Sequence, residues 1–221
     1  MPDTPNYYSI RHVTRYRYSN PVRESIMRLY MRPRTGWNQH VRTFQLRIQP
    51  HAQVFGYSDF LGNAVYHFDV PGEHQELVIT AESTVEVERP EPMPESLPVS
   101  EWDALHSARE RGEHWDMLSE STYARYTPSL AEFAERCEIY KTGDPLTSLM
   151  KLNTAIFENF EYDQELTQVH SPIDVALRSG RGVCQDFAHI MTAIVRHWGI
   201  PCRYVSGYLY HREGGTEQSP D

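Results

Sequence analysis

The chain has 221 residues, and its 21 Lys and Arg side chains against 30 Asp and Glu give a formal net charge of −9. Such an acidic chain is a poor candidate for non-specific binding to nucleic acid or to an anionic membrane surface. Hydrophobic residues make up 39% of the chain, enough for a packed core, which excludes wholesale disorder. Apolar stretches run only a few residues, residues 1–12 lack the order of a signal peptide, and three cysteines are too few for a disulfide framework. We therefore expect a cytoplasmic protein without a membrane span.

A proline-rich stretch divides the sequence into two parts. Residues 90–98 read PEPMPESLP, which can neither continue a helix nor pair as a central strand. The charge changes at the same point, because residues 1–90 hold 10 basic and 9 acidic side chains, whereas residues 91–221 hold 11 and 21. The sequence predicts a β domain over 1–89, a stiff linker, and a second domain over 99–221.

The first part has the period of β-strands. Apolar and polar side chains alternate over residues 44–48 and again over 77–87. Leu61-Gly62-Asn63 lies between two further alternating segments, which indicates a hairpin. Strands at this spacing with no helical pattern predict a small, β-sandwich-like domain.

From residue 99 onward the apolar period becomes helical. Helix starts are predicted at Ser100, as a capping pair with Asp103, and at the dipeptides Thr127-Pro128, Asp144-Pro145 and Ser171-Pro172. The helix after Asp144 is expected to turn six residues inward: Leu146, Leu149, Met150, Ile156, Phe157 and Phe160. A last helix over about 183–198 precedes Gly199 and a strand over 203–210. The chain is thus predicted to be an α+β protein.

Cys184 falls in the first turn of that last helix, just after Gly180 and Gly182. Backbone N–H groups and the helix dipole at this position favour a thiolate and can hold a developing oxyanion. A core role competes with this interpretation, because Cys184 shares an apolar stripe with Phe187 and Met191 and a buried cysteine is often a small hydrophobe. Residues alone leave both alternatives open.

The other two cysteines and the last helix have simpler interpretations. Cys137 and Cys202 are expected to be packing residues. Ile190, Met191, Ile194 and Trp198 are the expected buried anchors of the last helix.

The segment GVCQDFAHIMTAIVRHWGIPCRYVSGYL, residues 182–209, resembles the nucleophile segment of the transglutaminase-like superfamily. The shared features are Gly182, Cys184, the small residue Ala188, the Gly199-Ile200-Pro201 turn and a following strand. The N-terminal region resembles the β domain that precedes this core in a bacterial subgroup. Its matching segments are HVTRYRYSNPV (12–22), DFLGNAVYHFDV (59–70) and ITAESTVEV (79–87).

The resemblance implies a papain-like core in which Cys184 is the catalytic nucleophile, a histidine is the base and an acidic residue orients that histidine. In the family these partners lie in His-Ala-Trp and Asp-Pro segments after the strand, and residues 211–221, which follow the expected strand here, contain neither pattern. The core is therefore expected to be truncated, in a fragment of a longer protein or in a naturally shortened one. His211 is the candidate base closest to the missing segment.

Other polar residues near Cys184 have plainer explanations. Asp186 fits a charge favoured by the helix dipole. His189 lies about 140° around the helix from Cys184 and is expected to be a surface or hydrogen-bonded histidine. Arg178 and Arg181 could attract an acidic substrate group, but a solvated loop is the simpler interpretation. No metal-ligand spacing occurs and no cofactor is implied.

The leading hypothesis is a cysteine protease, amidohydrolase or acyltransferase of transglutaminase type, acting on peptide or protein amides through a thioester at Cys184. The alternative is a non-catalytic interaction module with an incomplete triad. We expect no nucleic-acid or membrane partner. A homo-oligomer or a partner chain is expected to cover the exposed edge of strand 203–210.

Overall fold

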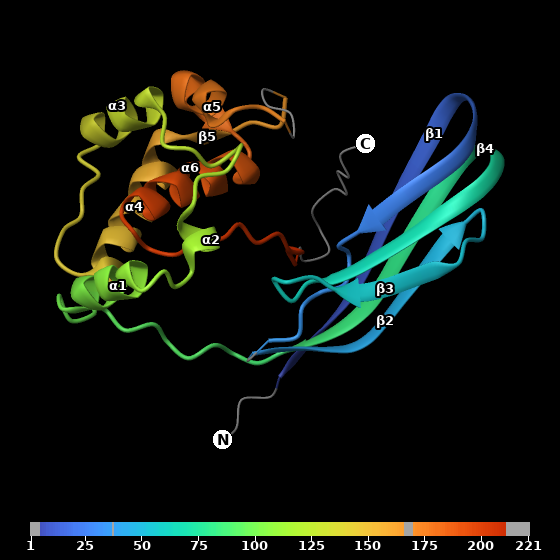
Figure 1. Ribbon diagram of the computed structural model, residues 1–221, viewed down its shortest axis with the longest axis horizontal. Coiled ribbons are helices and arrows are strands. Elements are labelled where there is room, and N and C mark those ends of the chain that lie inside the picture. Colours follow the sequence, from blue (N-terminus) through green and yellow to red (C-terminus); the bar gives the residue numbers. More distant parts are fainter. Residues whose placement is uncertain (1–4, 37, 166–169, 211–221) are drawn as a thin grey trace. The chain divides into compact units, whose positions relative to one another are not determined.

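The computed structural model describes residues 5–36, 38–165 and 170–210. The chain divides into two compact units, Met1–Pro92 with Gly207–Asp221, and Met93–Ser206, which are described in turn (Figure 1). The first contains an antiparallel sheet and the second is mainly helical, so the expected mixed α and β fold is confirmed. No helix among the described residues is both long enough and apolar enough to cross a membrane.

The β unit is organised around one long strand. Strand β4 (Ala64–Val87) pairs along its length with strand β1 (Asn6–Leu29), and the two strands run antiparallel to each other. On its other edge β4 pairs first with β3 (Val54–Ser58) and then with β2 (Gln39–Gln49). The four strands therefore form a single antiparallel sheet (Figure 1).

The predicted alternation determines which side of β4 is buried. Leu77, Ile79, Ala81, Ser83 and Val85 are buried at every second position of that strand. The predicted hairpin is also present, with Ser58 opposite Ala64 and the Asp59 carboxylate accepting from the backbone N–H of Asn63 at 2.8 Å. Period and turn chemistry therefore predict the sheet correctly in these segments.

The helical unit contains six helices and one short parallel strand pair within the described residues. The helices are α1 (Glu101–Glu110), α2 (Trp115–Leu118), α3 (Pro128–Arg136), α4 (Pro145–Asn159), α5 (Ile173–Ser179) and α6 (Cys184–His197). Strands β5 (Glu161–Tyr162) and β6 (Arg181–Gly182) form the pair.

Two of the predicted helix caps form as expected. The Thr127 hydroxyl accepts from Leu130 N at 3.3 Å, and the Asp144 carboxylate accepts from Leu146 N at 2.9 Å. Ser100 makes no side-chain cap, because its own φ of −61° and ψ of −13° are already helical. Helix α5 starts one residue later than predicted, with extended Pro172 as its N-cap.

The core of the helical unit gathers around α6. Ile190, Ile194 and Trp198 are buried as predicted, whereas Met191 is only half-buried and packs at the edge of the core. They pack with buried residues of the other helices, among them Leu130, Phe133, Leu152, Ile156, Ala176 and Leu177.

The predicted inward face of α4 is wrong at two residues. Met150 and Phe157 are 49% and 83% exposed, while Leu152, which the prediction omitted, is fully buried. At 100° per residue, Met150 and Phe157 lie about 160° and 140° from Leu152, on the opposite side of the helix. Apolar residues occur on both sides of α4, so the residue types alone did not indicate which side packs against the core.

The strand predicted over 203–210 does not form. Residues 201–210 belong to no strand, because a strand needs a ladder partner and no described segment pairs with them. Residues 207–210 instead group with the β unit, where the Tyr208 hydroxyl lies 3.3 Å from the Met31 carbonyl and 3.0 Å from His12 Nδ1. Residues 203–210 therefore do not present the strand edge that a homo-oligomer or a partner chain was expected to cover, and whether such a partner binds here stays a prediction.

Candidate active site

Cys184 is the first residue of α6, and its side chain is exposed. Cys137 and Cys202 are half-buried and pack against the helical core, as expected. The alternative that treats Cys184 as a core residue requires a buried thiol, and the structure contradicts it. Cys184 therefore combines accessibility with a position in the first helical turn.

Helix α6 begins without a side-chain cap. Its N-cap residue is Val183, which is extended at φ −110° and ψ 171° and has a hydrocarbon side chain that cannot accept a hydrogen bond. The first helical bond runs from Phe187 N to the Val183 carbonyl at 3.2 Å. Cys184 consequently stands where a helix presents N–H groups and the positive end of its dipole.

The Asp186 carboxylate faces inward and is 2% exposed. It accepts from Val183 N at 2.9 Å, so it reaches back across the start of its own helix. The sequence predicted only a charge favoured by the helix dipole. The structure adds a direct hydrogen bond to the residue that precedes Cys184.

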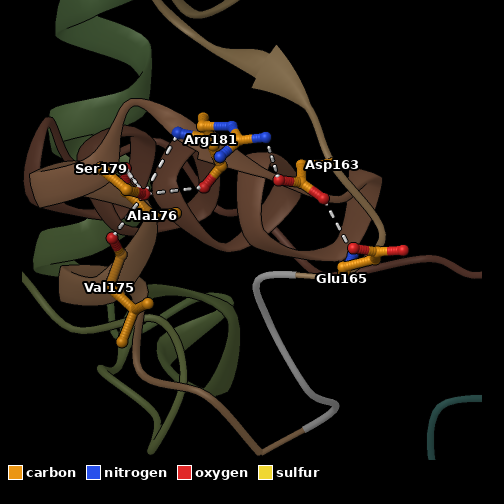
Figure 2. A network of polar contacts seen from close by, with 6 residues as sticks. All are labelled: Asp163, Glu165, Val175, Ala176, Ser179 and Arg181. Carbon is orange, nitrogen blue, oxygen red and sulfur yellow. Dashed lines mark hydrogen bonds and ion pairs between the residues drawn. The ribbon is translucent and has the colours of Figure 1, made fainter.

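A polar network fixes the turn that leads from α5 into α6, and Figure 2 shows its side chains. The Ser179 hydroxyl donates to the Val175 carbonyl at 2.9 Å and accepts from Arg181 N at 3.2 Å. The Arg181 guanidinium pairs with the Asp163 carboxylate at 2.6 Å. Gly180, at φ +67°, ends α5 in the left-handed conformation that glycine adopts without strain.

This network gives Arg181 a structural partner. Arg181 is engaged with Asp163, whose side chain is only 14% exposed, and so it holds the turn. Arg178 is exposed on α5. A gate that attracts an acidic substrate group finds no support in this ion pair.

His189 is buried between aromatic rings. Its imidazole stacks on Tyr123, with ring centroids 5.6 Å apart and an angle of 11° between planes, and it lies 5.2 Å from the Tyr204 ring. Burial lowers the pKa of His189, and the Asp186 charge partly opposes this by raising it. The surface position considered from the sequence is therefore wrong.

This aromatic cluster extends to a second histidine. The Tyr123 hydroxyl lies 3.0 Å from His170 Nδ1. Sequence reasoning missed the cluster because Tyr123, His170, His189 and Tyr204 belong to separate segments and share no local pattern.

Two further predictions from the sequence concern His211 and metal binding. His211 lies outside the described residues. Within residues 5–36, 38–165 and 170–210, no group of three or more His, Cys, Asp or Glu side chains could hold a metal ion.

Two regions of the chain match known families. Residues 8–86 match the bacterial transglutaminase-like N-terminal region, and residues 133–219 match the transglutaminase-like superfamily. The second region contains Cys184 and all of α6. The two regions occur in the order expected from the resemblance.

Relatives and a solved structure resemble the chain over most of its length. An uncharacterized protein of Mycobacterium leprae is 33% identical over 90% of this chain and 70% of its own length. An uncharacterized protein of Mycobacterium tuberculosis is 32% identical over 91% of this chain, which spans 65% of that relative.

A crystal structure from Cytophaga hutchinsonii, described as a putative cysteine protease, superposes with a TM-score of 0.68 at 18% identity. It covers 91% of this chain, which in turn spans 66% of that protein. At this identity the likeness shows the fold. Together with the two family regions and the mycobacterial relatives, it leads to one conclusion: the chain belongs to the transglutaminase-like superfamily and carries the N-terminal region of its bacterial members.

Proposed function

We propose that this protein is a transglutaminase-like cysteine enzyme that acts on peptide or protein amides through a thioester at Cys184. The observation that carries the proposal is the exposed thiol at the first position of α6. A helix start favours the thiolate, which is the reactive form of cysteine. Membership of the superfamily supports the same assignment.

In the proposed reaction, the Cys184 thiolate attacks the carbonyl carbon of a carboxamide. The carbonyl π electrons move onto oxygen, and the backbone N–H of Cys184 with a neighbouring donor stabilises that oxyanion. When the carbonyl re-forms, the carbon–nitrogen bond breaks and the amine leaves with a proton taken from water or from the histidine that acts as acid and base in this family. An acyl thioester remains on Cys184.

The second half of the reaction releases the acyl group. A water molecule or an amine attacks the thioester carbonyl, loses a proton and expels the thiolate, which gives a carboxylic acid or a new amide. Hydrolysis and acyl transfer differ only in this second nucleophile. We favour hydrolysis, and His211 is the first histidine to mutate in the search for the base.

Alkylation with iodoacetamide over a pH series tests the nucleophile. The chain provides its own controls, because Cys137 and Cys202 are half-buried and differ from Cys184 in position. Peptide mass mapping should show that Cys184 is alkylated at pH 6 much faster than a free thiol such as glutathione. A rate no faster than that of glutathione would favour the non-catalytic interaction module instead.

Trapping with hydroxylamine tests the thioester. The protein is incubated with a glutamine-containing peptide and hydroxylamine, and mass spectrometry looks for the peptide hydroxamate. Because the family's His-Ala-Trp segment is missing after residue 210, we expect the hydroxamate to form only slowly with the wild-type chain, and not at all with Cys184→Ala. Equal yields from the two proteins would exclude Cys184 as the acyl carrier.

A further inference from the structure

Asp186 is a buried carboxylate two residues from Cys184, and the reaction proposed above does not use it. Its side chain is 2% exposed and belongs to the largest fully buried side chains of the molecule. Burial of a carboxylate is costly unless hydrogen bonds or charges compensate it. Its location in the first turn of α6 places it where the helix dipole favours a negative charge.

The Asp186 carboxylate contacts the two residues that precede Cys184, Gly182 and Val183. Its Oδ2 accepts from Val183 N at 2.9 Å. A Cβ atom on Gly182 would lie 2.8 Å from the same oxygen, 3.2 Å from the Cβ of Asp186 and 3.3 Å from the Cβ of Ala176. Asp186 therefore occupies the space that any side chain at position 182 would need.

Backbone hydrogen bonds also hold this turn. Gly182 pairs with Tyr162 in the β5–β6 ladder, and its carbonyl accepts from Asp163 N at 2.8 Å. Backbone pairing thus holds Gly182, and the hydrogen bond to Asp186 holds the next residue, Val183. Cys184 follows Val183 directly and is the first residue of α6.

We propose that Asp186 is a positioning residue that, through its hydrogen bond to Val183 N and its contact with Gly182, sets the place of the Cys184 thiol at the start of α6. The inference rests on the proposed function of Cys184. It assigns the effect to the hydrogen bond rather than to the negative charge. A negative charge this close to a thiolate opposes its formation.

Two variants of Asp186 separate the hydrogen bond from the charge. Asp186→Asn retains an oxygen that can accept from Val183 N, so Cys184 should be alkylated at pH 6 at the wild-type rate or faster. Asp186→Ala removes the acceptor, so alkylation in the folded protein should slow about tenfold as the thiol loses its ordered helix start. Amide turnover should fall further, by about 10²-fold, because small misplacements of a reacting group are costly.

Matched controls separate positioning from loss of stability. Asp144→Ala removes another buried carboxylate of the helical unit and should leave the alkylation rate of Cys184 unchanged. Gly182→Ala should slow alkylation as Asp186→Ala does, and the double variant should lose less than the two effects combined because the shorter side chain relieves the clash. Gly36→Ala is its control, since a Cβ there meets nothing within 4 Å.

The result that overturns the inference is a folded Asp186→Ala protein alkylated at the wild-type rate, or an Asp186→Asn protein as slow as Asp186→Ala. If Asp186→Ala does not fold, a wild-type alkylation rate in Gly182→Ala overturns it equally. Alkylation needs no turnover, so this outcome is distinct from failure of the proposed function, which appears as amide turnover that survives in Cys184→Ala.

Discussion

The starts of α4 and α6 solve one physical problem in two ways. Both helices begin with N–H groups that have no acceptor inside the helix. At α4 the Asp144 carboxylate, 5% exposed, accepts from Leu146 N, Thr147 N, the Thr147 hydroxyl and Leu97 N. At α6 the N-cap is Val183, which accepts nothing through its side chain, and the next residue is an exposed cysteine.

The difference lies in which side of the helix start is closed. Asp144 closes the start of α4 from the N-cap position and covers the N–H groups themselves. Asp186 holds the start of α6 from inside the helix, through Val183 N, and Cys184 stays exposed. The first arrangement covers the N–H groups at the helix start, whereas the second leaves the first residue of the helix accessible.

The largest expected effect comes from removing the thiol. Cys184→Ala should abolish thioester formation, a loss of 10³-fold or more in amide turnover, since no second acyl carrier takes over. Because the side chain is exposed, the free energy of unfolding should change by less than about 0.5 kcal/mol. Hydroxamate formation and urea denaturation measure the two quantities. A large loss of stability would contradict the contrast with α4.

Removal of the cap of α4 should have the opposite effects: a loss of stability with no loss of turnover. Asp144→Ala leaves four donors without their acceptor and should lower the Tm of the helical unit by roughly 4–8 °C. Turnover measured well below that Tm should stay unchanged. Differential scanning calorimetry gives the Tm, with Asp103→Asn on the exposed side of α1 as a control. An unchanged Tm in Asp144→Ala would contradict the claim that the Asp144 cap stabilises the start of α4.

The two helix starts also differ in how far the sequence predicts them. The Asp144-Pro145 and Thr127-Pro128 signals are local, so cap and helix follow from neighbouring residues. The contact between Asp186 and Gly182 is equally short in sequence. It was missed because the direction of the Asp186 side chain depends on which face of α6 is buried.

Longer-range features were harder to predict for the same reason. The aromatic stack around His189 needs Tyr123 and Tyr204, which come from other segments. A strand over 203–210 needs a pairing partner that alternation in one segment cannot provide. Phe157 has an apolar side chain on the solvent side of α4, so its residue type misled the prediction.

Low pH should reduce the stability that the Asp144 cap gives to the start of α4, with a smaller effect than the substitutions above. Hydrogen bonds, first that from the Thr147 hydroxyl, lower the pKa of Asp144 to about 2 from its usual 3.8. The unfolded chain therefore binds a proton at higher pH than the folded one, and stability that is complete above pH 3.8 is lost as the pH falls towards 2. Urea midpoints between pH 5 and pH 2 should fall less steeply in Asp144→Asn than in the wild type. Parallel slopes would show that the cap carries no charge-dependent stability.

The smallest expected effect concerns His189, one turn beyond the supported start of α6. Burial lowers its folded pKa below the usual 6.5, so the unfolded chain takes up a proton first as the pH falls. Stability linked to His189 is complete above pH 6.5 and is lost progressively below it, until the folded imidazole is also protonated. His189→Phe retains a ring to stack on Tyr123 and cannot titrate, so its Tm should fall less than that of the wild type between pH 7.5 and pH 5. His106→Asn, on exposed α1, is the control and should keep the wild-type dependence. If His189→Phe and the wild type lose the same Tm over this range, the buried imidazole is not the group that senses acid.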